Sequence, residues 1–220
     1  MLRLTAYFFS ILFHPLIIIT YMIIIMLMVD PYKFGVHSVG SDRGMLEVIR
    51  AFASTFFIPA IAVLMMKGLG FINSLEMKDP KERIGPYIVT GIFYLAYFYA
   101  MYRNPDMPQI YKVFLLGSVI GLFLAFFLNL FSKISAHGVG MGGLLGMVLI
   151  TVFRTKQTSF IINVGNPLEI SLNTLLITTI ILCGVVGTSR LLLNAHRPKD
   201  LYGGFLVGVT TQFIALNILM

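Results

Sequence analysis

The segment Ser189–Asp200 gathers an arginine, a histidine and an aspartate between two hydrophobic runs, with the sequence Ser-Arg-Leu-Leu-Leu-Asn-Ala-His-Arg-Pro-Lys-Asp. Its place between such runs predicts a position near a membrane surface, where charge is costly unless it is paired or used. Asp200 follows His196 by four residues, so a helical turn after Pro198 would put both side chains on one face. A carboxylate there would fix the imidazole tautomer and stabilise its cation, which suits a nucleophile or base. Arg190 adds a fork of donors for a phosphate or carboxylate oxygen. An ordinary basic interfacial loop is the alternative.

The composition is that of a membrane protein. Of 220 residues, 58% are hydrophobic and only 11% are charged, against roughly 25% charged in a soluble domain. We therefore expect an all-α polytopic membrane helix bundle, with residues 1–220 forming a single integral membrane domain. The net charge of +7 fits membrane-interface anchoring and anionic headgroups, and with so few charges it is no nucleic-acid signature. Cys183 is the only cysteine, which excludes an intrachain disulfide or a cysteine-based metal site.

Hydrophobic runs long enough to cross a bilayer, about 20 residues each, predict six to seven transmembrane helices. The first is interrupted by His14-Pro15, and Pro59 predicts a kink in the second. The stretch 154–167 is expected to be a loop. The seven runs are Thr5–Val29, Val48–Gly70, Pro86–Tyr102, Tyr111–Phe131, Gly138–Phe153, Leu168–Thr188 and Leu201–Met220.

The order of these runs predicts where the polar segments lie. Two crossings separate Asn73–Gly85 from Ser132–His137, and two more separate that segment from Ser189–Asp200, so all three are expected at one membrane surface. Together they form a cationic site with two histidines, suited to an anion such as a phosphate. The polar residues that they contribute are Lys78, Lys81, Arg83, Ser135, His137, Arg190, His196 and Asp200.

Glycine spacing supports this convergence. Gly138, Gly142 and Gly146 recur every four residues, as do Gly204 and Gly208, and small residues at this spacing let membrane helices approach closely. The helices that carry them begin just after the two histidines, so their packing would bring the histidines together. Plain helix packing without catalytic meaning is the alternative, and both can hold.

The three polar segments resemble the signatures of the type 2 phosphatidic acid phosphatase superfamily. Ser189-Arg190, five residues, His196, three residues and Asp200 match its third signature, Ser-Arg-x5-His-x3-Asp. Ile134-Ser135-Ala136-His137 keeps the Ser and His of Pro-Ser-Gly-His. Lys78 and Gly85-Pro86 have the spacing of Lys-x6-Arg-Pro, with Gly in place of Arg and with Arg83 two residues early. The resemblance covers a phosphatase-like core of about 73–220.

The resemblance implies roles for these residues. His196 would be the nucleophile that takes the phosphoryl group, Asp200 would orient it, and His137 would protonate the leaving oxygen. Lys78, Ser135 and Arg190, joined by Arg83, would bind the phosphate oxygens. The activity implied is hydrolysis of a lipid phosphate or diphosphate through a phosphohistidine, without metal or other cofactor, in a bacterial inner membrane with the site facing outward. The departures at Gly85, Ile134 and Ala136 point to altered substrate choice or weak activity.

Other functions are compatible with the same residues. A catalytically weak or inactive lipid-binding or transport protein on the same scaffold is one, although the apolar runs hold almost no charge that would mark a pathway. A lipid phosphotransferase is another. His137, His196 and Asp200 are possible zinc ligands, which the surrounding Lys and Arg residues disfavour. His14 and His37 are expected to be incidental.

Overall fold

The chain forms a bundle of apolar helices, which confirms the predicted all-α membrane architecture. The computed structural model describes residues 2–75, 77, 80–164 and 166–220. Within them, seven helical segments are long and apolar enough to cross a membrane, and each coincides with one predicted run. The elements are α1 (Leu2–Leu12), α2 (Ile18–Val29), α3 (Asp42–Phe52), α4 (Ile58–Gly68), α5 (Ile84–Arg103), α6 (Gln109–Phe131), α7 (Ala136–Arg154), β1 (Ser159–Val164), β2 (Asn166–Ser171), α8 (Leu172–Leu192) and α9 (Pro198–Leu219).

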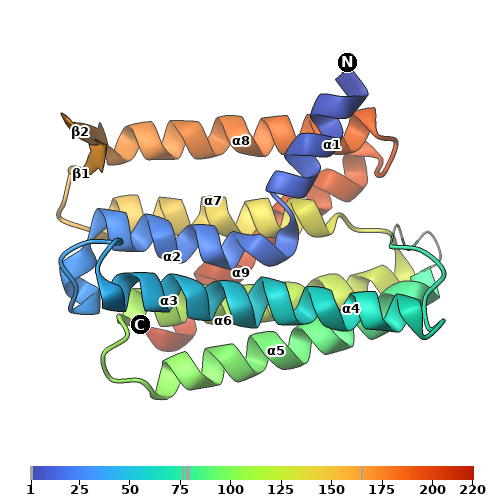
Figure 1. Cartoon of the computed structure of the whole chain (residues 1–220). Helices are drawn as coiled ribbons and strands as arrows, with labels where there is room; N and C mark the ends of the chain where they lie inside the picture. Colours follow the sequence, from blue (N-terminus) through green and yellow to red (C-terminus); the bar gives the residue numbers. More distant parts are fainter. Residues whose placement is uncertain (1, 76, 78–79, 165) are drawn as a thin grey trace.

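The first two membrane segments are broken where proline predicts it. Between α1 and α2 the chain makes a 3₁₀ turn over Pro15–Ile17, and α1 tilts away from α2 to pack along α8 (Figure 1). Between α3 and α4 a π-helical turn spans Ala53–Phe57, directly before Pro59. Proline has no N–H to donate into the preceding turn, and a π turn is one way in which a helix accommodates that loss.

The prediction of a loop over 154–167, with the sixth run starting at Leu168, is wrong in part. β1 and β2 form an antiparallel hairpin in which Ser159 faces Ser171, and α8 begins only at Leu172. The β-branched residues of Phe160-Ile161-Ile162 favour a strand. Hydropathy alone merged the end of the second strand with the helix that follows, because Leu168 and Ile170 extend the apolar run of that helix.

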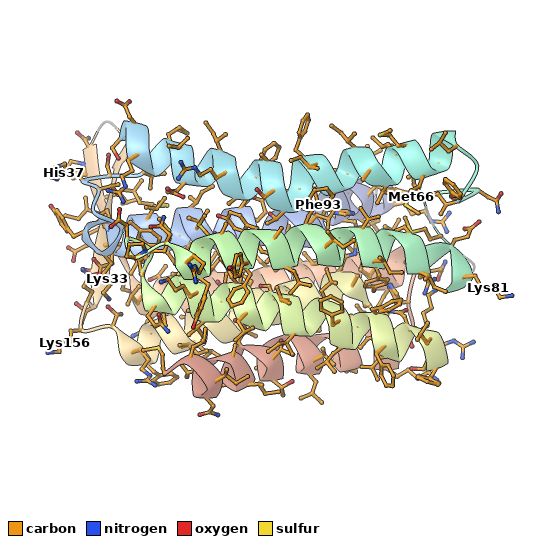
Figure 2. The ribbon with its side chains drawn as sticks, turned by 90° about the horizontal axis from the view of Figure 1, so that it is seen from below. Lys33, His37, Met66, Lys81, Phe93 and Lys156 are labelled. Carbon is orange, nitrogen blue, oxygen red and sulfur yellow. The ribbon has the colours of Figure 1, made fainter. Side chains whose placement is uncertain are left out.

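The two ends of the bundle carry different polar segments. The α4–α5, α6–α7 and α8–α9 connections lie at one end, which is also where the chain begins, and the hairpin lies at the other (Figure 1). We call the first of these the site end. Lys33, His37 and Lys156 lie at the hairpin end, opposite Lys81 (Figure 2). The predicted gathering of the three polar segments at one surface is therefore confirmed for their described residues.

Glycines set the closest contact in the bundle, between α7 and α9. A Cβ on Gly204 would lie 2.6 Å from the Ser135 carbonyl oxygen, and one on Gly208 would overlap the Val139 carbonyl oxygen. From the other side, a Cβ on Gly142 would overlap the Phe205 backbone. The two helices thus meet backbone to backbone, as the glycine spacing predicted.

We predict that Gly208→Ala destabilises the protein, because its methyl group would have to enter the α7 backbone rather than displace a flexible side chain. Overpacking of this kind costs about 1–3 kcal/mol, which should lower the unfolding midpoint in detergent by several degrees. Gly184→Ala is the matched control, since a Cβ on this α8 glycine meets nothing within 4 Å. Equal midpoints for the two variants would contradict the packing described above.

Candidate functional site

A cavity of about 1130 Å³ opens among the polar segments and runs into the bundle. Its walls come from α1, α2, α4, α5, α6, α7, α8 and α9, together with the α4–α5, α6–α7 and α8–α9 connections. At the site end its charged and imidazole side chains are His14, Arg83, Lys133, His137, Arg190 and His196. The cavity thus joins residues from both halves of the chain.

Two backbone turns place His196 at this cavity. α8 ends with Asn194 in the left-handed conformation at φ 53°, and the Asn194 and Ala195 N–H groups donate to the carbonyls of Leu191 and Arg190. This arrangement is a Schellman turn, and asparagine is one of the residues that tolerate it. α9 then starts at Pro198, whose fixed φ suits the first position of a helix.

Asp200 lies beside His196 and caps α9. Its Oδ2 accepts from the Arg197 backbone N–H at 3.0 Å and lies 3.8 Å from Nδ1 of His196, which is too long for a hydrogen bond. Both side chains are mostly buried, and Nδ1 has no hydrogen-bond partner. The predicted proximity of the pair is therefore present, with Nδ1 turned toward the carboxylate.

Among the described residues no ion pair joins Arg83, Lys133 or Arg190 to a carboxylate, although Asp200 lies close enough to favour the charged form of Lys133. Arg83 donates from Nε to the Met77 carbonyl at 2.9 Å and from Nη1 to Oδ1 of Asn129 at 3.2 Å. Nε of Arg190 is buried and has no hydrogen-bond partner. The ion pairs of Lys33, Arg43 and Arg50 with carboxylates belong to the other part of the bundle. This arrangement leaves a positive site at which an anion gains the most.

Burial and these cations shift the pKa values of His196 in the α8–α9 connection and of Lys133 in the α6–α7 connection. Burial, followed by the charges of Lys133 and Arg190, lowers the pKa of His196 from 6.5 to about 4, partly offset by Asp200. Burial and the nearby guanidinium of Arg83 lower the pKa of the Lys133 ammonium. In the absence of an anion, the site therefore resists further positive charge and keeps His196 neutral at pH 7.

His137 stands at the start of α7 and is tied to the N-terminal helix. Its Nε2 lies 3.0 Å from the Ser10 carbonyl oxygen, which can only accept, so Nε2 carries the proton in this contact. The His14 ring packs edge-on against it, with 5.7 Å between ring centroids. His14 was expected to be incidental, and it is instead a wall of the cavity beside His137. His37, at the opposite end, has no such place.

Ser135 positions helices rather than facing the cavity. Its side chain is fully buried and accepts from the Gly138 N–H at 3.2 Å, which caps α7. Its own N–H donates to the Asp200 carbonyl at 3.1 Å, so this residue joins the starts of α7 and α9. Of the other predicted phosphate ligands, Arg83 and Arg190 line the cavity, and Lys78 lies outside the described residues.

Sequence reasoning missed three residues of the site: His14, Lys133 and Asn129. Asn129 connects Arg83, Tyr87 and the Ile134 N–H through its amide. Its position, a lone amide near the end of an apolar run, was a usable signal, because such groups need partners inside a membrane. Lys133 lies within the predicted polar segment Ser132–His137, but none of the three family signatures includes it.

No group of three or more His, Cys, Asp or Glu side chains converges in a metal-binding arrangement within the described residues. Of the three possible zinc ligands, His137 binds the Ser10 carbonyl and Asp200 caps a helix, so two of them are engaged in other contacts. Comparison with models of protein families, with curated proteins and with solved structures found no match to this chain.

We predict that orthovanadate and inorganic phosphate, at millimolar-order concentrations, raise the unfolding midpoint of the purified protein. A ligand at 100 times its Kd stabilises the folded state by about 2.7 kcal/mol. Arg190→Ala should lose most of this shift, whereas the control Lys156→Ala, at the hairpin end, should keep it. An identical response of the two variants would show that the anion binds elsewhere.

The site should also titrate in a defined direction. NMR of the imidazole is expected to show His196 protonating near pH 4 in the anion-free protein. Saturating phosphate should raise this midpoint, because the anion offsets the cations that disfavour the imidazolium. Arg190→Ala should raise it as well, and Asp200→Asn should lower it. A midpoint at the ordinary value of about 6.5 in the anion-free protein would contradict the electrostatics described here.

Proposed function

We propose that this protein hydrolyses the phosphate ester or diphosphate of a membrane lipid through a phosphohistidine on His196. The observation that carries the proposal is the combination of unbalanced cations and an unpartnered imidazole around one cavity. Five of the seven buried side-chain nitrogen and oxygen atoms without hydrogen-bond partners in the described structure belong to residues that line it: Ser10, Arg190, His196 and Gln212. Such groups are costly to leave unpaired, and a phosphorylated ligand would supply an acceptor for Nε of Arg190.

The chemical step uses the free nitrogen of His196. With Nδ1 beside Asp200, Nε2 is the nitrogen that attacks phosphorus while the bond to the lipid oxygen breaks. Arg83, Lys133 and Arg190 stabilise the charge on the non-bridging oxygens, as preorganised donors do in phosphoryl transfer. The 3.8 Å gap to Asp200 shortens as the imidazole becomes cationic, since catalytic hydrogen bonds are often long before a substrate binds. Water then attacks the phosphohistidine and releases phosphate.

Proton transfer to the leaving oxygen falls to His137, the second imidazole at the cavity. Its Nε2–H is held by the Ser10 carbonyl, so the proton for the leaving oxygen is carried on Nδ1 of the imidazolium, a form that the negative charge of the bound phosphate favours; His137 is left neutral after the transfer. His14 packs against the ring and limits its rotation. In this proposal α1 therefore positions the acid, a role that the signature residues alone do not supply.

The lipid would reach the site from the side of the bundle. The cavity lining includes Ile11 of α1 and Leu64 of α4, which expose 72% and 53% of their surfaces. α1 packs along α8 whereas α4 packs along α5, so the two helices leave room for an aliphatic chain between them. The phosphate would then meet the cations while its tail stays in an apolar environment.

One observation favours the second candidate, a lipid-binding protein without turnover. Asp200 already accepts the Arg197 N–H and makes no hydrogen bond to His196. If the carboxylate stays a helix cap when substrate binds, the imidazole lacks its orienting partner and the site would hold a lipid phosphate without cleaving it.

We predict that His196→Ala abolishes phosphate release from lipid phosphates and keeps oxyanion binding, because Arg83, Lys133 and Arg190 remain. The loss should be several orders of magnitude, as for removal of other catalytic nucleophiles. His37→Ala, at the opposite end, is the matched control and should behave as the parent. Phosphate release would be assayed with phosphatidic acid and with a polyprenyl diphosphate. Parent-level release by His196→Ala would end the nucleophile assignment, and oxyanion binding without release by the parent would favour the lipid-binding alternative.

A further inference from the structure

The deep part of the cavity contains an amide that has no partner. Gln212 of α9 lines the cavity and is 0% exposed. Neither its Oε1 nor its Nε2 has a hydrogen-bond partner. Thr211 and Ser118 nearby behave differently, since their hydroxyls donate to the Gly208 and Phe114 carbonyls of their own helices. Gln212 is thus the polar residue in this region whose donors and acceptor are both unused.

The position of this amide makes its lack of partners costly. Gln212 follows Asp200 by twelve residues, and an α-helix rises 1.5 Å per residue, so the two residues lie about 18 Å apart along α9. That depth is near the middle of a hydrocarbon core about 30 Å thick, where unpaired polar groups are the most expensive. Its zero exposure means that no water-sized sphere reaches it, so solvent does not satisfy it.

Glycines on two facing helices make room for the amide. A Cβ on Gly117 of α6 would lie 2.5 Å from Oε1, and a Cβ on Gly146 of α7 would lie 3.2 Å from Cβ of Gln212. A Cβ on Gly143 of α7 would lie 3.4 Å from Nε2 of Gln212. An apolar side chain would fill this space at no polar cost, so packing alone does not account for a glutamine here.

We propose that Gln212 recognises a hydroxyl group carried at mid-chain by the lipid whose phosphate binds at the site end. This inference rests on the proposed function, because the phosphate fixes how far the chain reaches into the cavity. A hydroxyl both donates and accepts, and so pairs with Oε1 and Nε2 together. In this proposal the glutamine side chain, which packs against Gly117 in the structure, turns toward the cavity to meet the hydroxyl. The substrate class is then a phosphorylated lipid with a hydroxylated chain.

The test compares two ligands that differ only in this hydroxyl. Octadecylphosphonate, with and without one mid-chain hydroxyl, cannot be hydrolysed, so binding is measured apart from turnover. Isothermal titration calorimetry on the full chain in detergent should give a Kd about tenfold lower for the hydroxylated ligand, in keeping with one buried hydrogen-bonding group. Gln212→Met should reduce the preference to about twofold or less while it leaves the Kd of the plain phosphonate unchanged.

Two further variants keep the test decisive. Asn217→Leu removes an exposed amide from the same helix and should leave the preference intact. Gly117→Ala fills the present place of the Gln212 amide, which should turn the amide toward the cavity, so this variant should keep the preference; it replaces Gln212→Met if that variant does not fold. Equal Kd values of the parent for both phosphonates would overturn the inference and leave the proposed function standing. A preference that survives in Gln212→Met, or one that is lost in Gly117→Ala, would also overturn it, and binding of neither phosphonate would overturn both.

Discussion

The backbone contact between α7 and α9 determines where both histidines of the site can be. Gly204 and Gly208 let α9 lie against the Ser135 and Val139 carbonyls, and the Ser135 N–H donates to the Asp200 carbonyl at the same level. Because His137 begins one helix and His196 immediately precedes the other, this contact fixes the two imidazoles at one cavity. Interfaces without side chains between them leave little freedom for the helices to slide, which is the kind of positioning that phosphoryl transfer requires.

The charged side chains around the cavity connect this packing to the chemistry that we propose. Arg83, Lys133 and Arg190 meet at the cavity, and among the described residues the Asp200 carboxylate offsets them only in part. Burial and these cations keep His196 neutral near pH 7. A membrane protein with only 11% charged residues places these cations together at a cost to its own stability. In the function that we propose, a bound anion would offset that cost.

Much of this arrangement could be read from the sequence. The hydropathy of the chain predicted the seven crossings, their order predicted that the polar segments share one surface, and the glycine spacing predicted the α7–α9 contact. His14 was missed because its nearness to His137 depends on the break at Pro15 and on α1 packing along α8, neither of which a pattern specifies. The sequence also did not predict that Ser135 caps α7 or that Asp200 accepts the Arg197 N–H. A motif specifies residue types only. The atom that such a side chain binds depends on where the helices begin, which the motif does not give.

The central claim is that His196 carries a covalent phosphoryl group during turnover. Its most direct test is to mix the protein with a lipid phosphate, quench with base, under which phosphohistidine survives, and map the phosphorylated peptide by mass spectrometry. The account predicts phosphorylation of the peptide containing His196, with none in His196→Ala. Turnover without a phosphopeptide, or a phosphoryl group on His137 instead, would contradict it.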